Sequence, residues 1–367
     1  MPAAQRLGQL RRHVCSAPTA SAPLRASLHA PAAAVAPLDG AALNLPLTAG
    51  VGFNYFDGER FVDMHGPDAR PCYGDLRADD PEVEAANRSK LTFDFFVKRE
   101  VPVFDARSVA SDLELDRHGV CLRHAPTAMA GPDFYDQAKV DSVYLQECRE
   151  YIMRETGATA VLPFDSTVRN RDPSSPAAGY AENRPHNDHT LLSGPRRTRE
   201  LLGEDPVNDA VLEHRFAIVN VWRRWDGGDD WPLCCCTYDR LDYQRDMQIQ
   251  DLVYPHRTGE TYTVRAESAP SHQYLWFSQM NIDEGILLKI FDSDDSASRG
   301  SLHTGFENEA ALARDDPARE SMEVRCIVLW APEELAGRAT LRGVASNVGE
   351  GKRGPSGHDN DVYRASS

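Results

Sequence analysis

Short runs of apolar residues, separated by polar turns, recur along most of the chain. Between residues 45 and 125 they include 91–97 and 101–104, which we interpret as strands because β-branched and aromatic residues dominate them. From residue 160 onward the pattern predicts strands at 160–164, 216–222, 274–277, 286–291 and 324–330. Many short strands joined by polar turns are typical of a β-sandwich or a jelly-roll barrel.

A helical segment is expected between the two strand-rich regions. Its buried stripe, at helical spacing, consists of Tyr144, Cys148, Tyr151 and Ile152. Asp141 can cap the start of this helix, and Gly157 suits its end. A second, shorter helix is expected over 197–202. The pattern therefore predicts a mainly β fold with flanking helices.

The two ends of the chain differ in composition from its middle. Residues 1–40 are rich in Ala, Pro, Ser and Arg, which fits either a disordered tail or an organelle-targeting leader. Residues 348–367 are rich in Gly, Ser and Asp, and we expect a flexible tail there. Between the ends we expect one domain over 41–347, with N-terminal strands and supporting helices at 41–158 and a β-rich core at 159–335.

Charge and hydropathy exclude two classes of partner. The 367 residues include 40 basic and 56 acidic side chains, a formal net charge of −16. Nucleic-acid binding depends on clustered Lys and Arg, so no nucleic-acid partner is expected. The sequence has no apolar run of about 18 residues, so no membrane span is expected either.

Eight cysteines are scattered along the chain, and none of them forms a CxxC pair. They occupy positions 15, 72, 121, 148, 234, 235, 236 and 326. Disulfide frameworks belong to short secreted chains, and cysteine-based zinc sites use closely spaced pairs, so neither is expected. We expect a reducing, cytoplasmic location.

The candidate chemistry begins with the triplet His186-Asn-Asp188. In a strand, residues i and i+2 share a face, so this imidazole and this carboxylate would point the same way. They would supply two of the three ligands of a two-His-one-carboxylate facial triad, which leaves open positions on ferrous iron. The triplet alone is common in solvated turns, but His303 offers a third ligand near the last predicted strands.

Beyond His303 the chain offers two candidate anchors for an acidic ligand. Arg319 and Ser321 form an R-x-S triplet, and Arg325 begins an apolar strand. A guanidinium with a nearby hydroxyl suits the distal carboxylate of a dicarboxylate, because its planar fork matches the two oxygens. The spacing leaves open which arginine has this role.

The order of these motifs, H-x-D, a distant His and then R-x-S, resembles that of the Fe(II)/2-oxoglutarate-dependent oxygenases. More narrowly, the chain is similar to the branch with gibberellin desaturase, the cephamycin methoxylation protein and fungal secondary-metabolite hydroxylase/desaturases. Supporting segments between about residues 95 and 335 include Val103-Phe-Asp-Ala-Arg107, Asn220-Val-Trp-Arg223 and Arg319-Glu-Ser-Met-Glu-Val-Arg325. One departure is Cys234-Cys-Cys236, where relatives usually carry small apolar residues and an acid.

The resemblance implies a double-stranded β-helix, which is a jelly-roll, cupin-like core, within a single catalytic domain. His186, Asp188 and His303 would hold iron and form the catalytic centre. The cofactors implied are Fe(II), 2-oxoglutarate as cosubstrate and O2. The reaction implied is hydroxylation, desaturation or oxidative cyclisation of a small secondary metabolite.

The resemblance also implies roles for the residues that follow the triad. Arg319 and Ser321 would bind the far carboxylate of 2-oxoglutarate. Arg325 would reach the near carboxylate or take over the far one, so the choice between the two arginines stays open.

Two other functions are compatible with the residues. The chain could be a β-barrel that binds a small ligand without turnover, or a metal-independent enzyme of the methyltransferase type. Enzymes of the methyltransferase type normally have a Gly-rich turn after their first strand, and the sequence has no such turn. Replacing His186 or Asp188 separates these functions, because only an iron enzyme would lose metal and activity together.

Overall fold

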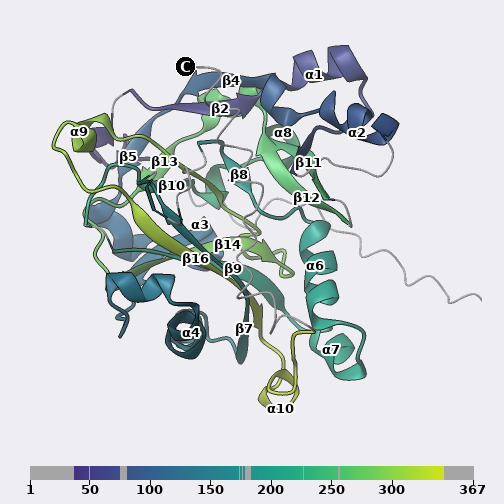
Figure 1. Ribbon diagram of the computed structural model, residues 1–367, viewed down its shortest axis with the longest axis vertical. Helices are drawn as coiled ribbons and strands as arrows, with labels where there is room; N and C mark the ends of the chain where they lie inside the picture. Colours follow the sequence, from purple (N-terminus) through teal and green to yellow (C-terminus); the bar gives the residue numbers. More distant parts are fainter. Residues whose placement is uncertain are drawn as a thin grey trace, which may run out of the picture.

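The computed structural model describes residues 37–48, 50–74, 81–172, 174–175, 177, 183–225, 227–254 and 257–342. The tail or leader predicted for residues 1–40 lies outside these ranges except for 37–40, and the predicted tail 348–367 lies entirely outside them. Two sheets lie face to face in the described part of the chain, and helices flank them (Figure 1).

The larger sheet has nine strands in the described residues and is mostly antiparallel. In spatial order they are β1 (Leu47–Thr48), β5 (Val103–Asp105), β13 (Tyr274–Trp276), β10 (Leu233–Cys236), β15 (Leu302–Gly305), β8 (His186–Asn187), β12 (Arg257–Val264), β11 (Met247–Tyr254) and β3 (Cys72–Gly74). The pairs β13–β5 and β11–β3 are parallel. The N-terminal strands therefore extend both edges of the sheet that contains the core strands.

The smaller sheet is antiparallel throughout. Its order is β6 (Val120–His124), β14 (Glu284–Asp292), β9 (Phe216–Arg224), β16 (Glu320–Leu329) and β7 (Ala160–Asn170). A separate hairpin-like pair joins β2 (Gly52–Phe56) to β4 (Phe96–Glu100). From β7 to β16 the chain passes repeatedly between the two large sheets, which is the winding of a jelly-roll barrel.

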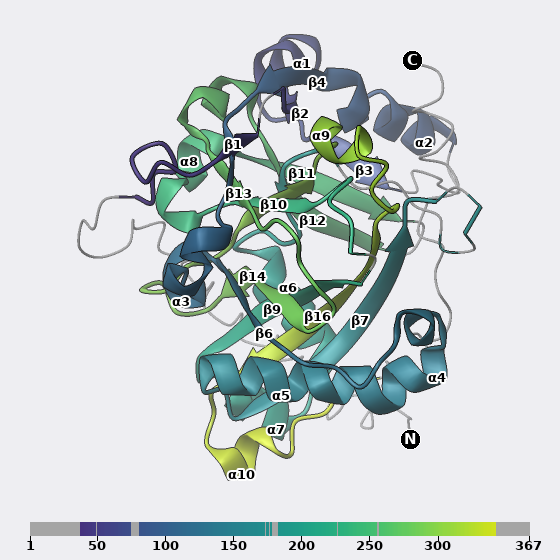
Figure 2. The same ribbon diagram turned by 90° about the vertical axis from the view of Figure 1, so that its left-hand side faces the viewer.

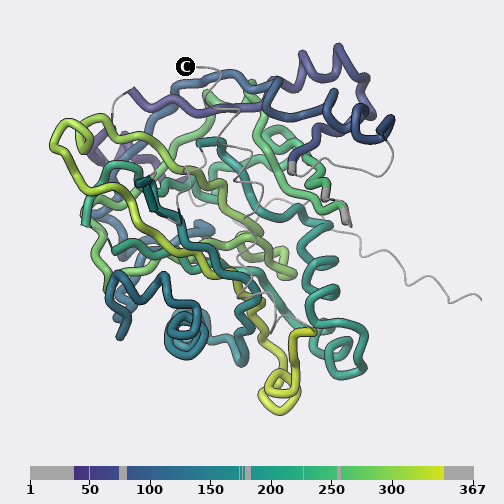
Figure 3. The backbone as a smooth tube through the Cα atoms, viewed as in Figure 1, coloured from purple at the N-terminus to yellow at the C-terminus, as the bar shows by residue number. Residues whose placement is uncertain are grey.

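Helices cover the outside of the barrel and its ends. They are α1 (Gly58–His65), α2 (Pro81–Arg88), α3 (Leu115–His118), α4 (Gln137–Lys139), α5 (Leu145–Thr156), α6 (Ser193–Leu202), α7 (Pro206–Val211), α8 (Tyr243–Asp246), α9 (Glu309–Leu312) and α10 (Glu333–Ala336). Figure 2 shows α5 lying along the outer face of the smaller sheet. Figure 3 shows α1, β2 and β4, the purple and blue N-terminal segments, gathered at one end of the molecule.

Short 3₁₀ and π turns connect several of these elements. The 3₁₀ turns span Thr92–Phe95, Arg107–Asp112, Gly131–Tyr135, Tyr238–Arg240 and Ala266–Ser271. A π-helical turn, Val140–Tyr144, joins α4 to α5.

The helix predicted from the Tyr144 stripe is confirmed, but its predicted start is wrong. All four stripe residues are buried, and Gly157 ends α5 with a positive φ of 66°. The helical segment begins earlier, at Gln137, because the Asp136 side chain accepts hydrogen bonds from the backbone of Ala138 and Lys139. Asp141 lies inside the π-helical turn.

The predicted strands mostly form, and each of the long ones extends beyond its prediction. The five core predictions correspond to β7, β9, β13, β14 and β16, and the predicted helix at 197–202 is the second half of α6. The strand expected at 91–97 is wrong over its first part, where residues 92–95 form a 3₁₀ turn. There the Thr92 hydroxyl donates to the Cys72 carbonyl, and Phe95 turns inward against Phe61.

Candidate functional site

The two core strands β8 and β15 bring the three predicted metal ligands together. His186 and His303 lie opposite each other in the register of these strands. Their Nε2 atoms lie 3.5 Å and 3.8 Å from Oδ1 of Asp188. Within the described part of the chain, this is the one group of three such side chains whose ligand atoms all lie within 4.8 Å of one another.

Backbone carbonyls fix the tautomers of both histidines. Nδ1 of His186 lies 2.8 Å from the Arg184 carbonyl, and Nδ1 of His303 lies 3.0 Å from the Ser301 carbonyl. A carbonyl can only accept, so each Nδ1 carries the hydrogen and donates it. Each Nε2 is left with a lone pair directed toward the triad, which is the arrangement of metal-binding imidazoles.

The two oxygens of Asp188 have different partners. Oδ2 accepts hydrogen bonds from Nδ2 of Asn220 at 3.0 Å and from Nε of Arg325 at 3.2 Å. Oδ1 faces the two histidines. Burial alone would raise the pKa of Asp188, but Arg325 and the histidines hold that pKa well below its usual range. The carboxylate is therefore ionised and has one oxygen available as a ligand.

The second histidine is kept neutral by its surroundings. Burial, followed by the neighbouring His186, lowers the pKa of His303. Two neutral imidazole nitrogens and one carboxylate oxygen converge from one side, which is the donor set of mononuclear non-haem iron sites. The residues present thus fit a ferrous ion.

The structure separates the two candidate arginines. Arg325 contacts the triad directly, whereas Arg319 precedes β16 and donates from Nη1 to the Trp231 carbonyl at 3.3 Å. Arg319 and Arg325 are six residues apart, and six strand residues span roughly 20 Å. The Cα atoms of the two arginines therefore lie far apart along the strand. Ser321 lies between them, 1% exposed, on the same strand face as Arg325.

Two residues of this site were missed by the sequence analysis as functional candidates. Asn220 on β9 lies directly opposite Arg325 on β16, and its Nδ2 also donates to Oε1 of Glu323 at 2.8 Å. A single Asn inside the apolar run 216–222 was the available signal for this role. Glu323 gave no signal, because an acid in an amphipathic strand is usually solvated.

Neighbouring residues have structural contacts. His189 Nδ1 lies 3.3 Å from the Ser193 hydroxyl at the start of α6. Residues 234–236 form β10, all three thiols are buried, and burial raises the pKa of each. Cys235 lies opposite His303 in register, so the unusual cysteines fill the strand beside the triad.

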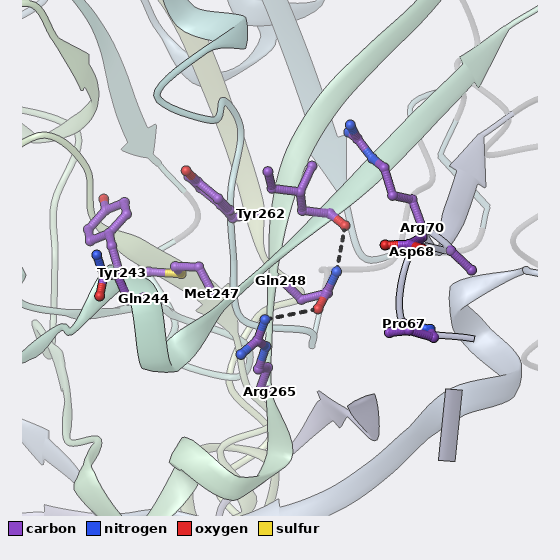
Figure 4. A pocket seen from close by; sticks show the side chains of 11 residues that line it. Pro67, Asp68, Arg70, Tyr243, Gln244, Met247, Gln248, Tyr262 and Arg265 are labelled. Atoms are coloured by element: carbon purple, nitrogen blue, oxygen red, sulfur yellow. Dashed lines mark hydrogen bonds between the residues drawn. The ribbon is translucent and has the colours of Figure 1, made fainter. Parts of the chain in front are cut away.

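A surface pocket of roughly 300 Å³ lies near α8 and β11 (Figure 4). Its walls include Tyr262, Met247 and Gln248, and Gln248 accepts a hydrogen bond from Arg265 at 3.3 Å. No residue of the triad lines this pocket. It is therefore separate from the candidate site.

The chain is similar in sequence to known proteins. The sequence model of the family described as "Oxidoreductase/YMDC permease-like domain" matches residues 63–329. Hydroxylase/desaturase efuI of Hormonema carpetanum is 27% identical, over 64% of this chain and 84% of its own. Fe(II)/2-oxoglutarate-dependent dioxygenase nvfI of Aspergillus novofumigatus is 27% identical, over 62% of this chain and 82% of its own.

A solved structure shows the same fold. The iron and alpha-ketoglutarate-dependent endoperoxidase NvfI superimposes with a TM-score of 0.62 at 22% identity, covering 77% of this chain and 97% of that protein. The predicted double-stranded β-helix and the resemblance drawn from the motifs are both confirmed. None of the helices in the described ranges is both long and apolar enough to span a membrane.

Proposed function

The chain belongs to the family described as Oxidoreductase/YMDC permease-like domain, and from that premise we propose what its site does. It is a non-haem Fe(II)/2-oxoglutarate-dependent oxygenase that acts on a small molecule. We assign it the hydroxylation, desaturation or oxidative cyclisation of a secondary metabolite. The observation that carries this proposal is the convergence of two Nε2 lone pairs and one Asp188 oxygen.

In this proposal His186, Asp188 and His303 hold the iron. Bound iron, together with 2-oxoglutarate and O2, supplies the oxidising power needed to attack an unactivated carbon. The chain contributes position and exclusion of water. Leu288 has no exposed surface and lies opposite Asn220 in register, so an apolar residue is the cross-strand neighbour of a residue that bonds Asp188.

Arg319 and Ser321 are proposed to bind the far carboxylate of 2-oxoglutarate. Both side chains are buried, at 3% and 1% exposure, on the row that leads along β16 away from the triad. A guanidinium and a hydroxyl at this depth form strong, charge-assisted hydrogen bonds to a carboxylate. Arg325 is less suited to this role because its side chain contacts three acidic residues of the protein.

We also propose that residues 41–347 form one catalytic domain in a reducing, cytoplasmic environment. Pairing of β1 and β5 with β13 supports the single domain, because the N-terminal segment completes the core sheet. The seven cysteines among the described residues are free thiols, as expected where disulfides do not persist. The net charge of −16 supports a small-molecule substrate rather than a nucleic acid.

Turnover of the cosubstrate tests the function before any substrate is known. We expect the purified protein to convert 2-oxoglutarate slowly to succinate, in a reaction that requires Fe(II) and O2. His186→Ala should abolish this conversion. Succinate formation that persists in His186→Ala, or that is independent of added Fe(II), would contradict the proposal.

A further inference from the structure

The contacts of Arg325 indicate a role that differs from cosubstrate binding. We propose that Arg325 is a positioning residue which, together with Asn220 and Glu323, holds Oδ2 of Asp188 so that Oδ1 faces the metal. This inference rests on the proposed function, because it assigns a role within the same metal site.

Arg325 uses most of its guanidinium on protein acceptors. Nε donates to Asp188, Nη2 donates to Oε2 of Glu323 at 2.6 Å, and Nη1 donates to Oδ2 of Asp165 at 2.8 Å and to the Thr167 hydroxyl at 3.3 Å. These bonds engage four of the five N–H donors of an arginine. Two parallel donors for a bidentate cosubstrate carboxylate are therefore not available without breaking existing bonds.

Asn220 closes a ring of hydrogen bonds with the same acids. Its Nδ2 donates to Asp188 at 3.0 Å and to Glu323 at 2.8 Å, and Glu323 in turn accepts from Arg325. The ring thus runs from Asp188 through Arg325, Glu323 and Asn220 back to Asp188. Register explains it, because Asn220 and Arg325 are direct cross-strand partners on β9 and β16.

The Asn220 amide is held in one orientation. Asn220 has no exposed surface, and its Oδ1 has no hydrogen-bond partner in the described residues. Flipping the amide would place this oxygen against the carboxylates of Asp188 and Glu323, so the two acids fix the orientation.

The local charge also suits a divalent cation. Three carboxylates, those of Asp188, Glu323 and Asp165, surround the single guanidinium of Arg325. With the histidines neutral, this leaves two negative charges in excess. This excess negative charge attracts a dication, while the hydrogen bond from Arg325 keeps the Asp188 carboxylate oriented.

Metal and cosubstrate affinities, measured separately on the full chain, test the proposal. Mn(II) is a redox-stable probe, and its dissociation constant is followed by electron paramagnetic resonance. The 2-oxoglutarate dissociation constant is then measured on the Mn(II)-loaded protein. The variants are Arg325→Gln, Arg325→Lys and Asn220→Ala, with Arg319→Ala as the contrast and Arg314→Gln as the matched control.

We expect Arg325→Gln, Arg325→Lys and Asn220→Ala to weaken Mn(II) binding by about 10- to 100-fold, as is usual when a partner of a metal ligand is removed. The 2-oxoglutarate affinity of the loaded forms should change by less than about 3-fold. The Arg314 side chain is 56% exposed and pairs with Asp316 at the surface, so Arg314→Gln should have little effect on either constant. Arg319→Ala should show the reverse pattern, with weaker 2-oxoglutarate binding and unchanged Mn(II) binding.

The sign of the Arg325→Gln effect separates positioning from simple electrostatics. Removing a cation next to a dication relieves repulsion, so a purely electrostatic Arg325 predicts tighter Mn(II) binding in the Gln variant. Tighter or unchanged Mn(II) binding would overturn the proposal, and so would a loss of affinity confined to 2-oxoglutarate. Should Arg325→Gln not fold, Asn220→Ala and Arg325→Lys decide by the same criterion.

The wild-type protein separates this inference from the proposed function. If the wild-type protein binds Mn(II) but does not bind 2-oxoglutarate, the proposed oxygenase function is contradicted. The positioning role would then be judged from the Mn(II) dissociation constants of the variants alone. Binding of both ligands, with an unchanged Mn(II) constant in Asn220→Ala and in both Arg325 variants, would contradict the positioning role alone.

Discussion

Replacing Arg319 by Ala should remove the anchor for the far carboxylate of 2-oxoglutarate. Arg319 is only 3% exposed, so a carboxylate bound to it is shielded from water. A hydrogen bond to a charged group contributes about 1.5–3 kcal/mol, and shielding favours the upper part of that range. A loss of about 2–3 kcal/mol corresponds to about 30- to 150-fold weaker 2-oxoglutarate binding.

Arg314 provides the matched control for this prediction. It lies five residues earlier, its side chain is 56% exposed, and it pairs with Asp316 at the surface. Arg314→Ala should leave 2-oxoglutarate binding unchanged. The assay is titration of 2-oxoglutarate into metal-loaded protein without O2. An unchanged dissociation constant in Arg319→Ala, or equal losses in the two variants, would refute the assignment of the anchor.

Three further predictions concern the framework around the site. Lys289 is fully buried and bonds to Asp292, so Lys289→Met should lower the free energy of unfolding by about 3 kcal/mol. A decrease below about 1 kcal/mol, measured by urea unfolding, would contradict this. Burial opposes ionisation of Asp246, but His272 and Arg245 nevertheless depress its folded-state pKa. Its contribution to stability is therefore present above the unfolded-state pKa of about 3.9 and is lost as pH falls further. Asp246→Asn should accordingly destabilise the protein at pH 7 more than at pH 3, and equal urea-midpoint shifts at both values would count against this reasoning. The thiols of residues 234–236 are buried and their pKa values are raised, so iodoacetamide should modify them only after the protein unfolds. Rapid labelling of these thiols in the native protein, measured by mass spectrometry, would contradict this.

Local patterns were sufficient to predict the core strands and to place His186 and Asp188 side by side. Apolar runs such as 286–291 and 324–330 are long enough to indicate buried strands without tertiary information. The His186-Asn-Asp188 triplet pairs its side chains through local geometry, and the two residues do converge, although β8 is only two residues long. His303 was identified because the motif order resembles one family.

Features that depend on distant pairing could not be predicted in this way. Thr92 leaves the strand pattern because of a bond to Cys72, and the helix starts before Asp141 because Asp136 caps it first. The ring around Asp188 depends on the register that places Asn220 opposite Arg325. No local pattern encodes that register, so the sequence left the choice between Arg319 and Arg325 open.

An anaerobic titration with Fe(II) and then 2-oxoglutarate tests the central claim most directly. A visible metal-to-ligand charge-transfer band arises when 2-oxoglutarate chelates ferrous iron. We predict this band in the wild-type protein, its loss in Asp188→Ala, and a requirement for more 2-oxoglutarate in Arg319→Ala. Bound Fe(II) without the band would show a metal protein that does not use 2-oxoglutarate, and no Fe(II) binding would contradict the account as a whole.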